Sequence, residues 1–260
     1  MGRDDRGRDN SLVPADLTEF LQKIRARTPA RILMGRAGAA YRTQTQLELR
    51  SAHAAARDAV RAEVDLLTAF GEVFTREWGL FEVQTQAADK DEFLLCPDLG
   101  RHFTDAARAM IQERCTRASD VQIVIGDGLS VPAVARQVPA LLPLICAGAR
   151  ERGWSIGQAF VIRHCRVGIL NEIGELLDPR VAVLLIGERP GLATAESLSA
   201  YMAYQPRRGH TDADRNLISN IHGRGVNTAD AVARILHLAG QMMNAKLSGY
   251  NLKETPPELG

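Results

Sequence analysis

Residues 121–152 read VQIVIGDGLSVPAVARQVPALLPLICAGARER and describe a strand, a turn and a helix in succession. The run from Val121 to Ile125 is rich in β-branched side chains and stops at Gly126-Asp127-Gly128, which is typical of a buried strand that ends in a turn. From Pro132 to about Arg152, apolar side chains recur at helical spacing behind a proline in the first turn. The stretch therefore predicts a β-strand followed by a long helix.

The same alternation continues toward the C-terminus. Further strands are expected at about 159–164 and 181–186, and further helices at about 168–177 and 228–243. Strands separated by helices predict an α/β fold with a mostly parallel, Rossmann-like sheet flanked by helices, which binds ligands beyond the carboxyl ends of its strands. Upstream the sequence reads as mostly helical. We therefore expect a disordered tail at 1–13, a smaller helical N-terminal region at 14–118 and the α/β domain at 119–260.

The composition points to no charged partner. Lys and Arg number 32 against 31 Asp and Glu, so charge alone attracts neither nucleic acid nor an anionic membrane. The apolar run at 134–149 is interrupted by Arg136, Gln137, Pro139 and Pro143, which leaves it short of the roughly 20 apolar residues that span a bilayer. The polar N-terminus lacks the apolar stretch of a secretory signal. These features predict a cytosolic protein without a transmembrane helix.

Cysteine and histidine patterns offer no metal site. The cysteines at 96, 115, 146 and 165 are widely spaced and form no CxxC pair, so we expect reduced and mostly buried thiols. The histidines form neither HxxxH nor HExxH. No GxSxG motif or Cys–His spacing indicates a nucleophile. The residue pattern therefore predicts no catalytic residue and no metal ligand.

Three loop motifs each allow two interpretations. The turn at Gly126–Gly128 could bind a phosphate, but the absence of GxGxxG and GxxxxGK[ST] favours a structural turn. Glu188, in the GERPG segment after a strand, could accept hydrogen bonds from a ligand or partner chain. It could equally pair with Arg189 or have a capping role, and the pattern leaves these interpretations open. The carboxylates of Asp212 and Asp214 suggest a metal or an acid–base pair, although neighbouring loop charges are usually solvated.

Longer segments resemble one known family, in the same order along the chain. They lie at 34–65, 121–130, 166–177, 184–204, 211–225 and 246–252 and include VQIVIGDGLS, RVGILNEIGELL, IGERPG and TDADRNLISNIHGRG. Together these segments, which extend from about residue 31 to 252, resemble the small subunits of ethanolamine ammonia-lyase.

The resemblance implies a cofactor, a partner and three site residues. Small subunits of this family bind adenosylcobalamin at the interface with a large barrel subunit, in a hetero-oligomer that contains several copies of each subunit and converts ethanolamine to acetaldehyde and ammonia. Cobalamin contacts in the family fall at positions that match Val167, Glu188 and Leu217. Val167 and Leu217 would pack on the corrin or offer backbone groups, and Glu188 would accept from a corrin amide. Relatives often have Cys at the position of Leu217, so no thiol role carries over.

The resemblance also assigns the substrate pocket and the radical chemistry to the large subunit. No catalytic residue is therefore expected in this chain. Relatives found in bacterial microcompartments often have a longer N-terminal extension, so a free cytosolic complex and an encapsulated one both remain open. Two further interpretations are a stand-alone nucleotide-dependent enzyme with its site at 126–128, and a scaffold subunit that binds no cofactor.

Overall fold

The computed structural model describes residues 15–27, 32 and 34–255, and the tail predicted at 1–13 lies outside them. Contacts divide the chain into two units, at residues 1–49 and 50–260. The first unit contains helix α1 (Ala15–Ala26) and a small hairpin of β1 (Arg36–Ala37) and β2 (Ala40–Tyr41). Helix α2 (Thr43–Arg61) begins in the first unit and ends in the second.

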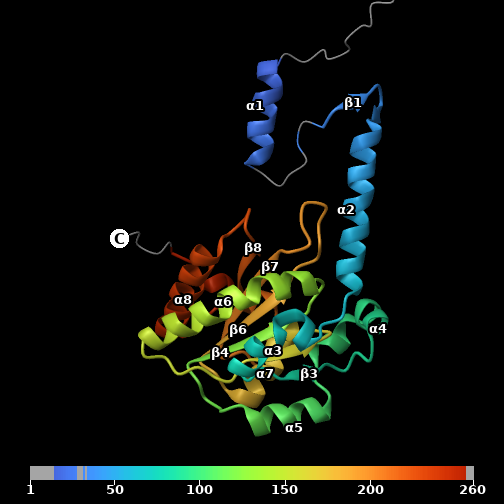
Figure 1. The fold of residues 1–260 in the computed structure, drawn as a ribbon. Helices are drawn as coiled ribbons and strands as arrows, with labels where there is room; N and C mark the ends of the chain where they lie inside the picture. The colour runs from blue at the N-terminus through green and yellow to red at the C-terminus, as the bar shows by residue number, and fades with distance from the viewer. Residues whose placement is uncertain (1–14, 28–31, 33, 256–260) are drawn as a thin grey trace, which may run out of the picture. The chain divides into compact units, whose positions relative to one another are not determined.

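The second unit is built on a six-stranded mixed sheet with the order β3–β5–β4–β6–β7–β8 (Figure 1). The pairs β3–β5, β5–β4 and β4–β6 are parallel, whereas β6–β7 and β7–β8 are antiparallel. The prediction of an α/β fold with a mostly parallel sheet is therefore confirmed. The strands are β3 (Glu82–Gln84), β4 (Val121–Gly126), β5 (Phe160–Arg163), β6 (Val181–Gly187), β7 (Leu198–Tyr204) and β8 (Asn216–Ile221).

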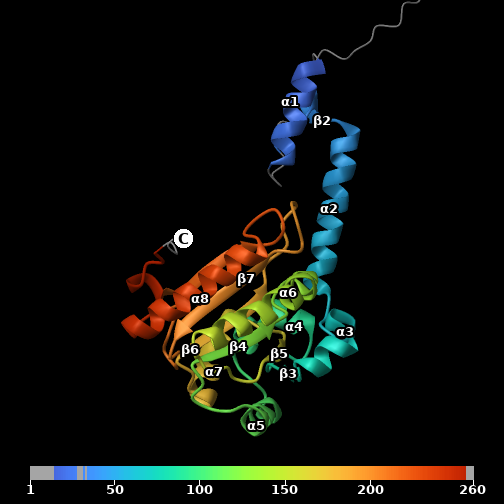
Figure 2. The same cartoon turned by 60° about the vertical axis from the view of Figure 1, so that its left-hand side comes forward.

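Helices cover the two faces of this sheet unequally (Figures 1 and 2). One face packs against α6 and α8, with α3 beside them. The hydrophobic core between these helices and the sheet reaches Ile218 and Ile221 of β8. The other face packs against α5 and α7, which cover β3, β5, β4 and β6. The helices of this unit after α2 are α3 (Leu66–Glu77), α4 (Lys90–Leu95), α5 (Asp105–Arg114), α6 (Val131–Glu151), α7 (Leu170–Leu177) and α8 (Thr228–Ala245).

The second face stays open over β7 and β8 in the described part of the chain. Tyr201 of β7 is half-buried, and Leu217 opposite it on β8 is 44% exposed. Two sheet strands thus present side chains that no described helix covers, next to the carboxyl ends of the parallel strands. A sheet of this type places its ligand at those ends.

Several strands differ from the expectation. The short strands β1 and β2 and the sheet strands β3 and β7 were not predicted, and β3 lies within the region 14–118 that the sequence predicts as helical. Strand β8 falls on the strand-like run at 217–222.

Helix α6 confirms the helix predicted from Pro132 to about Arg152, and it continues through Pro139 and Pro143. Among the described residues it is the one helix with the length and apolar composition to cross a membrane. Its side chains at Val134, Leu141 and Ile145 are fully buried in the core that it shares with the sheet.

Candidate functional site

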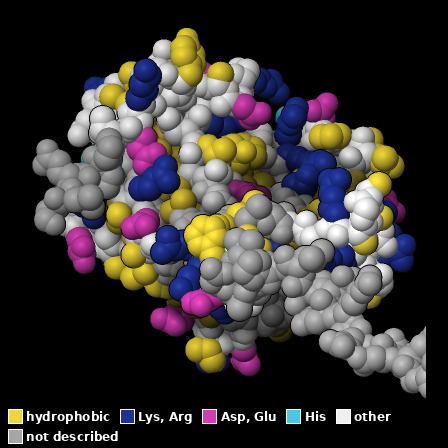
Figure 3. Space-filling view, turned by 90° about the horizontal axis from the view of Figure 1, so that it is seen from above, with side chains coloured by type: hydrophobic (Ala, Val, Ile, Leu, Met, Phe, Trp, Pro, Cys, Tyr) yellow, Lys and Arg dark blue, Asp and Glu magenta, His cyan; other side chains and the backbone are white. Residues whose placement is uncertain are grey.

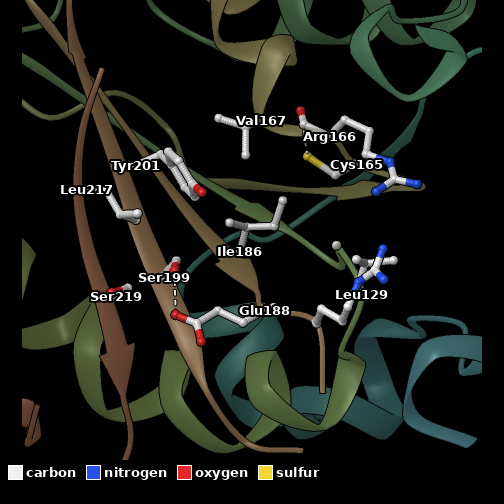
Figure 4. A pocket seen from close by; sticks show the side chains of 13 residues that line it. Leu129, Cys165, Arg166, Val167, Ile186, Glu188, Ser199, Tyr201, Leu217 and Ser219 are labelled. Carbon is white, nitrogen blue, oxygen red and sulfur yellow. Dashed lines mark hydrogen bonds between the residues drawn. The ribbon is translucent and has the colours of Figure 1, made fainter. Parts of the chain in front are cut away.

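A cavity of about 370 Å³ lies at the carboxyl ends of β4, β5 and β6 and continues onto β7 and β8. It is lined by Val167 after β5, Glu188 after β6 and Leu217 on β8, so the structure brings together all three residues that the resemblance singled out. Figure 4 shows the side chains of Val167, Leu217, Ile186 and Tyr201 directed toward a shared space. We call this space the platform cavity.

The floor of the platform cavity comes from the antiparallel strands. Leu217 lies directly opposite Tyr201 in the β7–β8 ladder, so both side chains stand on the same face of the sheet. Ser219 also lines the cavity, since residues two apart on a strand share a face. Burial raises the pKa of the Tyr201 phenol, and Asp212 and Glu188 add to the effect. Tyr201 therefore contributes a neutral hydroxyl to the floor, beside the apolar side chain of Leu217.

The segment that carries Val167 is held by a buried carboxylate. Asp127 accepts hydrogen bonds from the backbone N–H groups of His164 and Cys165, at 3.0 and 2.8 Å. The ammonium group of Lys90 lies 3.2 Å from Asp127 Oδ2 and also donates to the carbonyl of Gly128 at 3.3 Å. Lys90 and Asp127 thus tie the loop after β4 to the loop after β5, and the second loop delivers Val167 to the cavity.

These contacts favour the structural interpretation of the Gly126–Gly128 turn. Gly128 has a φ of +54°, and a Cβ at this position would lie 2.4 Å from the carbonyl oxygen of Gly187. The N–H of Leu129 donates to that same carbonyl at 3.0 Å. Because the turn is packed against the end of β6, its geometry is explained by the fold without a bound phosphate.

Gly128→Ala is therefore expected to destabilise the chain by about 2 kcal/mol, through the left-handed backbone conformation and the contact with the Gly187 carbonyl. Urea denaturation of the two proteins would measure the loss. Gly153→Ala is the matched control, since Gly153 also has a positive φ (+72°) but a Cβ at this position would meet no atom within 4 Å. Equal losses in both variants would show that the contact with β6 contributes nothing.

Glu188 is fixed by three donors of its own chain. Its Oε2 accepts from the Ser197 hydroxyl at 2.6 Å, and its Oε1 accepts from the Ser199 hydroxyl at 2.6 Å and from the backbone N–H of Asn220 at 2.8 Å. Among the described residues, Glu188 forms no ion pair with Arg189, which was one of the predicted alternatives. A carboxylate has about four acceptor positions. One position, on Oε2, is left for a donor from a ligand.

The remaining candidates have local structural roles. Asp212 pairs with Arg215, and Asp214 accepts from Thr211 in a capping box, so neither carboxylate is set up for a metal. Within residues 15–27, 32 and 34–255, no group of three or more His, Cys, Asp or Glu side chains has a metal-binding arrangement.

The prediction of reduced, mostly buried thiols is confirmed. All four cysteines are free, and only Cys96 is exposed. Complete burial raises the pKa of Cys165 well above its ordinary value, and Asp127 beside it adds to the effect. This thiol is therefore neutral and packs at the edge of the platform cavity.

Sequence reasoning missed part of the site. Ser199 and Tyr201 line the cavity from a strand that was not predicted, and Ser197 fixes Glu188 from the residue before it. A signal was present, because Leu198, Ala200 and Met202 alternate with the more polar positions in LSAYMAY, as in a half-buried strand. Arg166, which separates Cys165 from Val167, was also missed.

Fold and site together define an α/β protein with an open, largely apolar ligand platform beside the carboxyl ends of its parallel strands. Comparison with known proteins then gives the family. The model of the ethanolamine ammonia-lyase light chain (EutC) family matches residues 18–253. The chain belongs to this family, and the resemblance noted in the sequence is confirmed.

Curated relatives agree with the family model. The ethanolamine ammonia-lyase small subunit of Clostridium perfringens is 42% identical over 240 residues, which cover 92% of this chain and 79% of the relative. That of Clostridioides difficile is 42% identical over 240 residues, 92% of this chain and 80% of the relative. That of Clostridium acetobutylicum is 39% identical over 235 residues, 90% of this chain and 95% of the relative. The chain therefore covers most of the length of each of these small subunits.

Proposed function

We propose that this chain is the small subunit of an adenosylcobalamin-dependent ethanolamine ammonia-lyase and forms one wall of the cobalamin site, at the interface with the large catalytic subunit. The observation that carries the proposal is the convergence of Val167, Glu188 and Leu217 on the platform cavity from three separate segments. All three lie in region 119–260, which we propose as the Rossmann-like, cobalamin-contacting domain.

The chemistry of the platform cavity fits a corrin. A corrin offers broad apolar faces and a rim of amide side chains, so it needs an apolar surface bordered by hydrogen-bonding groups. Val167, Ile186 and Leu217 supply apolar surface, and Glu188 keeps one acceptor position for an amide N–H. Leu217, at 44% exposure, is open to a large flat ligand.

The roles of this chain are binding and orientation. Bound adenosylcobalamin supplies the radical by homolysis of its cobalt–carbon bond. Val167 and Leu217 would hold the apolar surface of the corrin and exclude water from it, and the carboxylate of Glu188 would orient the corrin by accepting from one of its amides. We assign no catalytic residue to this chain and propose that the substrate pocket lies in the large subunit.

The partner that we propose is the large subunit, in a hetero-oligomer with several copies of each chain. Exposed hydrophobic side chains lie among basic ones on the face seen in Figure 3. Leu67, Val73 and Leu95 of the unit 50–260 are 60, 68 and 81% exposed. Apolar surface of this kind suits a subunit interface. We place the complex in the cytosol, free or enclosed in a bacterial microcompartment.

The test is ammonia release from ethanolamine and adenosylcobalamin by this chain, by a large subunit from the same source, and by their mixture. Activity is expected only in the mixture, because each chain carries part of the site. Activity of this chain alone would contradict the division of labour. A properly assembled mixture without activity would contradict the proposed reaction and favour a scaffold or a nucleotide-binding protein.

A further inference from the structure

A second cavity of about 560 Å³ adjoins the platform cavity and shares Arg166 and Val167 with it. Its other walls come from the segment around Arg101, from Arg108 of helix α5, from helix α7 and from the β7–β8 loop. That loop contributes Arg208 and Arg215. We call it the arginine cavity. A ligand seated on the platform could extend into it past Val167.

As far as the structure describes the chain, Arg166 carries an unpaired positive charge in the arginine cavity, whereas Arg101 pairs with the exposed carboxylate of Asp98 at 2.7 Å. The acidic side chains in its walls are already engaged: Glu172 with Arg108, Asp212 with Arg215, and Glu175 with the backbone N–H of Arg208. No carboxylate among the described residues pairs with Arg166. Within the described part of the chain, its guanidinium donates to the carbonyl of Phe93 at 3.0 Å and stacks 4.1 Å over the Phe93 ring.

Two glycines make room for these arginines. A Cβ at Gly100 would lie 2.7 Å from Cγ of Arg166, and a Cβ at Gly168 would lie 2.9 Å from Cδ of Arg101. Arg166 and Arg101 are thus packed against backbone that has no side chain. Burial lowers the pKa of Arg166, and the charges of Arg189 and Arg101 lower it further. Arg166 is half-buried and Arg101 is exposed. An anion that binds between them would offset the repulsion between their positive charges.

We propose that Arg166, with Arg101 beside it, forms an anion subsite that receives the phosphodiester of the cobalamin nucleotide tail. This inference rests on the proposed function. The side chains on the corrin rim are neutral amides, so the phosphodiester is the anionic group that an arginine can recognise. A guanidinium matches phosphate oxygens with paired N–H donors. With the corrin in the platform cavity, the nucleotide tail would reach the arginine cavity past Arg166 and Val167, which line both cavities.

The test compares two ligands on the assembled complex of this chain with its large subunit. Aquacobalamin has the nucleotide tail, whereas diaquacobinamide has the corrin and its amides without the tail. Arg166→Met removes the charge and keeps an apolar side chain over Phe93. It is expected to weaken aquacobalamin binding by about 10- to 100-fold, the range for a charge-assisted hydrogen bond, and to leave diaquacobinamide binding within about threefold. Equilibrium dialysis measures both affinities without reference to activity.

Arg114→Met is the matched control, because Arg114 also stacks over a phenylalanine ring, at 4.3 Å from Phe81, and lines neither cavity. It should leave both affinities unchanged. Arg101→Met should show the same selective loss as Arg166→Met if Arg101 belongs to the subsite. Equal losses for both ligands would overturn the inference and leave Arg166 a structural role. A wild-type complex that binds neither ligand would instead contradict the proposed function.

Discussion

Lys90→Met is expected to lower the free energy of unfolding by about 3–5 kcal/mol, the usual result of removing one partner from a buried ion pair. The Lys90 side chain is 7% exposed and that of Asp127 is 1% exposed. Methionine fills much of the space of the lysine stem but leaves the Asp127 carboxylate buried without its counter-charge. The loop after β5 depends on that carboxylate through His164 and Cys165. Urea denaturation of the full chain would measure the change.

Arg61→Met provides the control, because it breaks another ion pair made by helix α4. The Arg61 and Asp91 side chains are 62 and 67% exposed, so the loss should stay below about 1 kcal/mol. Adding Asp127→Asn to Lys90→Met should recover part of the stability, since the buried charge is then gone. Similar small losses in Lys90→Met and Arg61→Met would mean that the buried pair contributes little to the fold.

The elements that the sequence predicted are those with a strong local pattern. Strand β4 and helix α6 follow from a β-branched run and a long helical repeat, and both were found within about one residue. Strand β3 has three residues and joins the sheet only through β5, which is far along the chain. Its place in the sheet depends on tertiary contacts, which no local pattern contains. Strand β7 did alternate, but its antiparallel direction is set by its pairing with β6.

For the site as well, local sequence features identified individual residues but not their tertiary contacts. The resemblance supplied Val167, Glu188 and Leu217, but residue patterns could not show that the three line one cavity. Leu217 reaches it only because β8 pairs with β7 in the register that sets it opposite Tyr201. The pair of Lys90 and Asp127 joins residues 37 positions apart. Long-range pairs of this kind are set by the packed fold, so sequence spacing does not reveal them.

Glu188→Ala is expected to weaken the binding of aquacobalamin to the assembled complex by about 100-fold. The carboxylate offers a charged acceptor to a corrin amide, and hydrogen bonds to charged groups contribute about 1.5–3 kcal/mol. The substitution also removes the carboxylate that accepts hydrogen bonds from Ser197, Ser199 and the backbone N–H of Asn220. Ser199 is only 3% exposed, so its hydroxyl would be left buried without this acceptor. The stability of the chain should therefore fall by about 2–3 kcal/mol as well.

Two comparisons separate the loss of a ligand contact from a general loss of structure. Glu196→Ala changes an exposed carboxylate on the same loop and should alter neither stability nor affinity. In Glu188→Gln the side chain keeps its length and one oxygen, so the stability should be higher than in Glu188→Ala. The affinity should recover less, because the free acceptor position on Oε2 is lost when the amide nitrogen takes the place of that oxygen. Unlike Arg166→Met, Glu188→Ala should weaken diaquacobinamide as strongly as aquacobalamin, because its proposed partner is a corrin amide that both ligands carry. An unchanged cobalamin affinity in a folded, assembled Glu188→Ala complex would refute the contact and leave Glu188 as a clamp between β7 and β8.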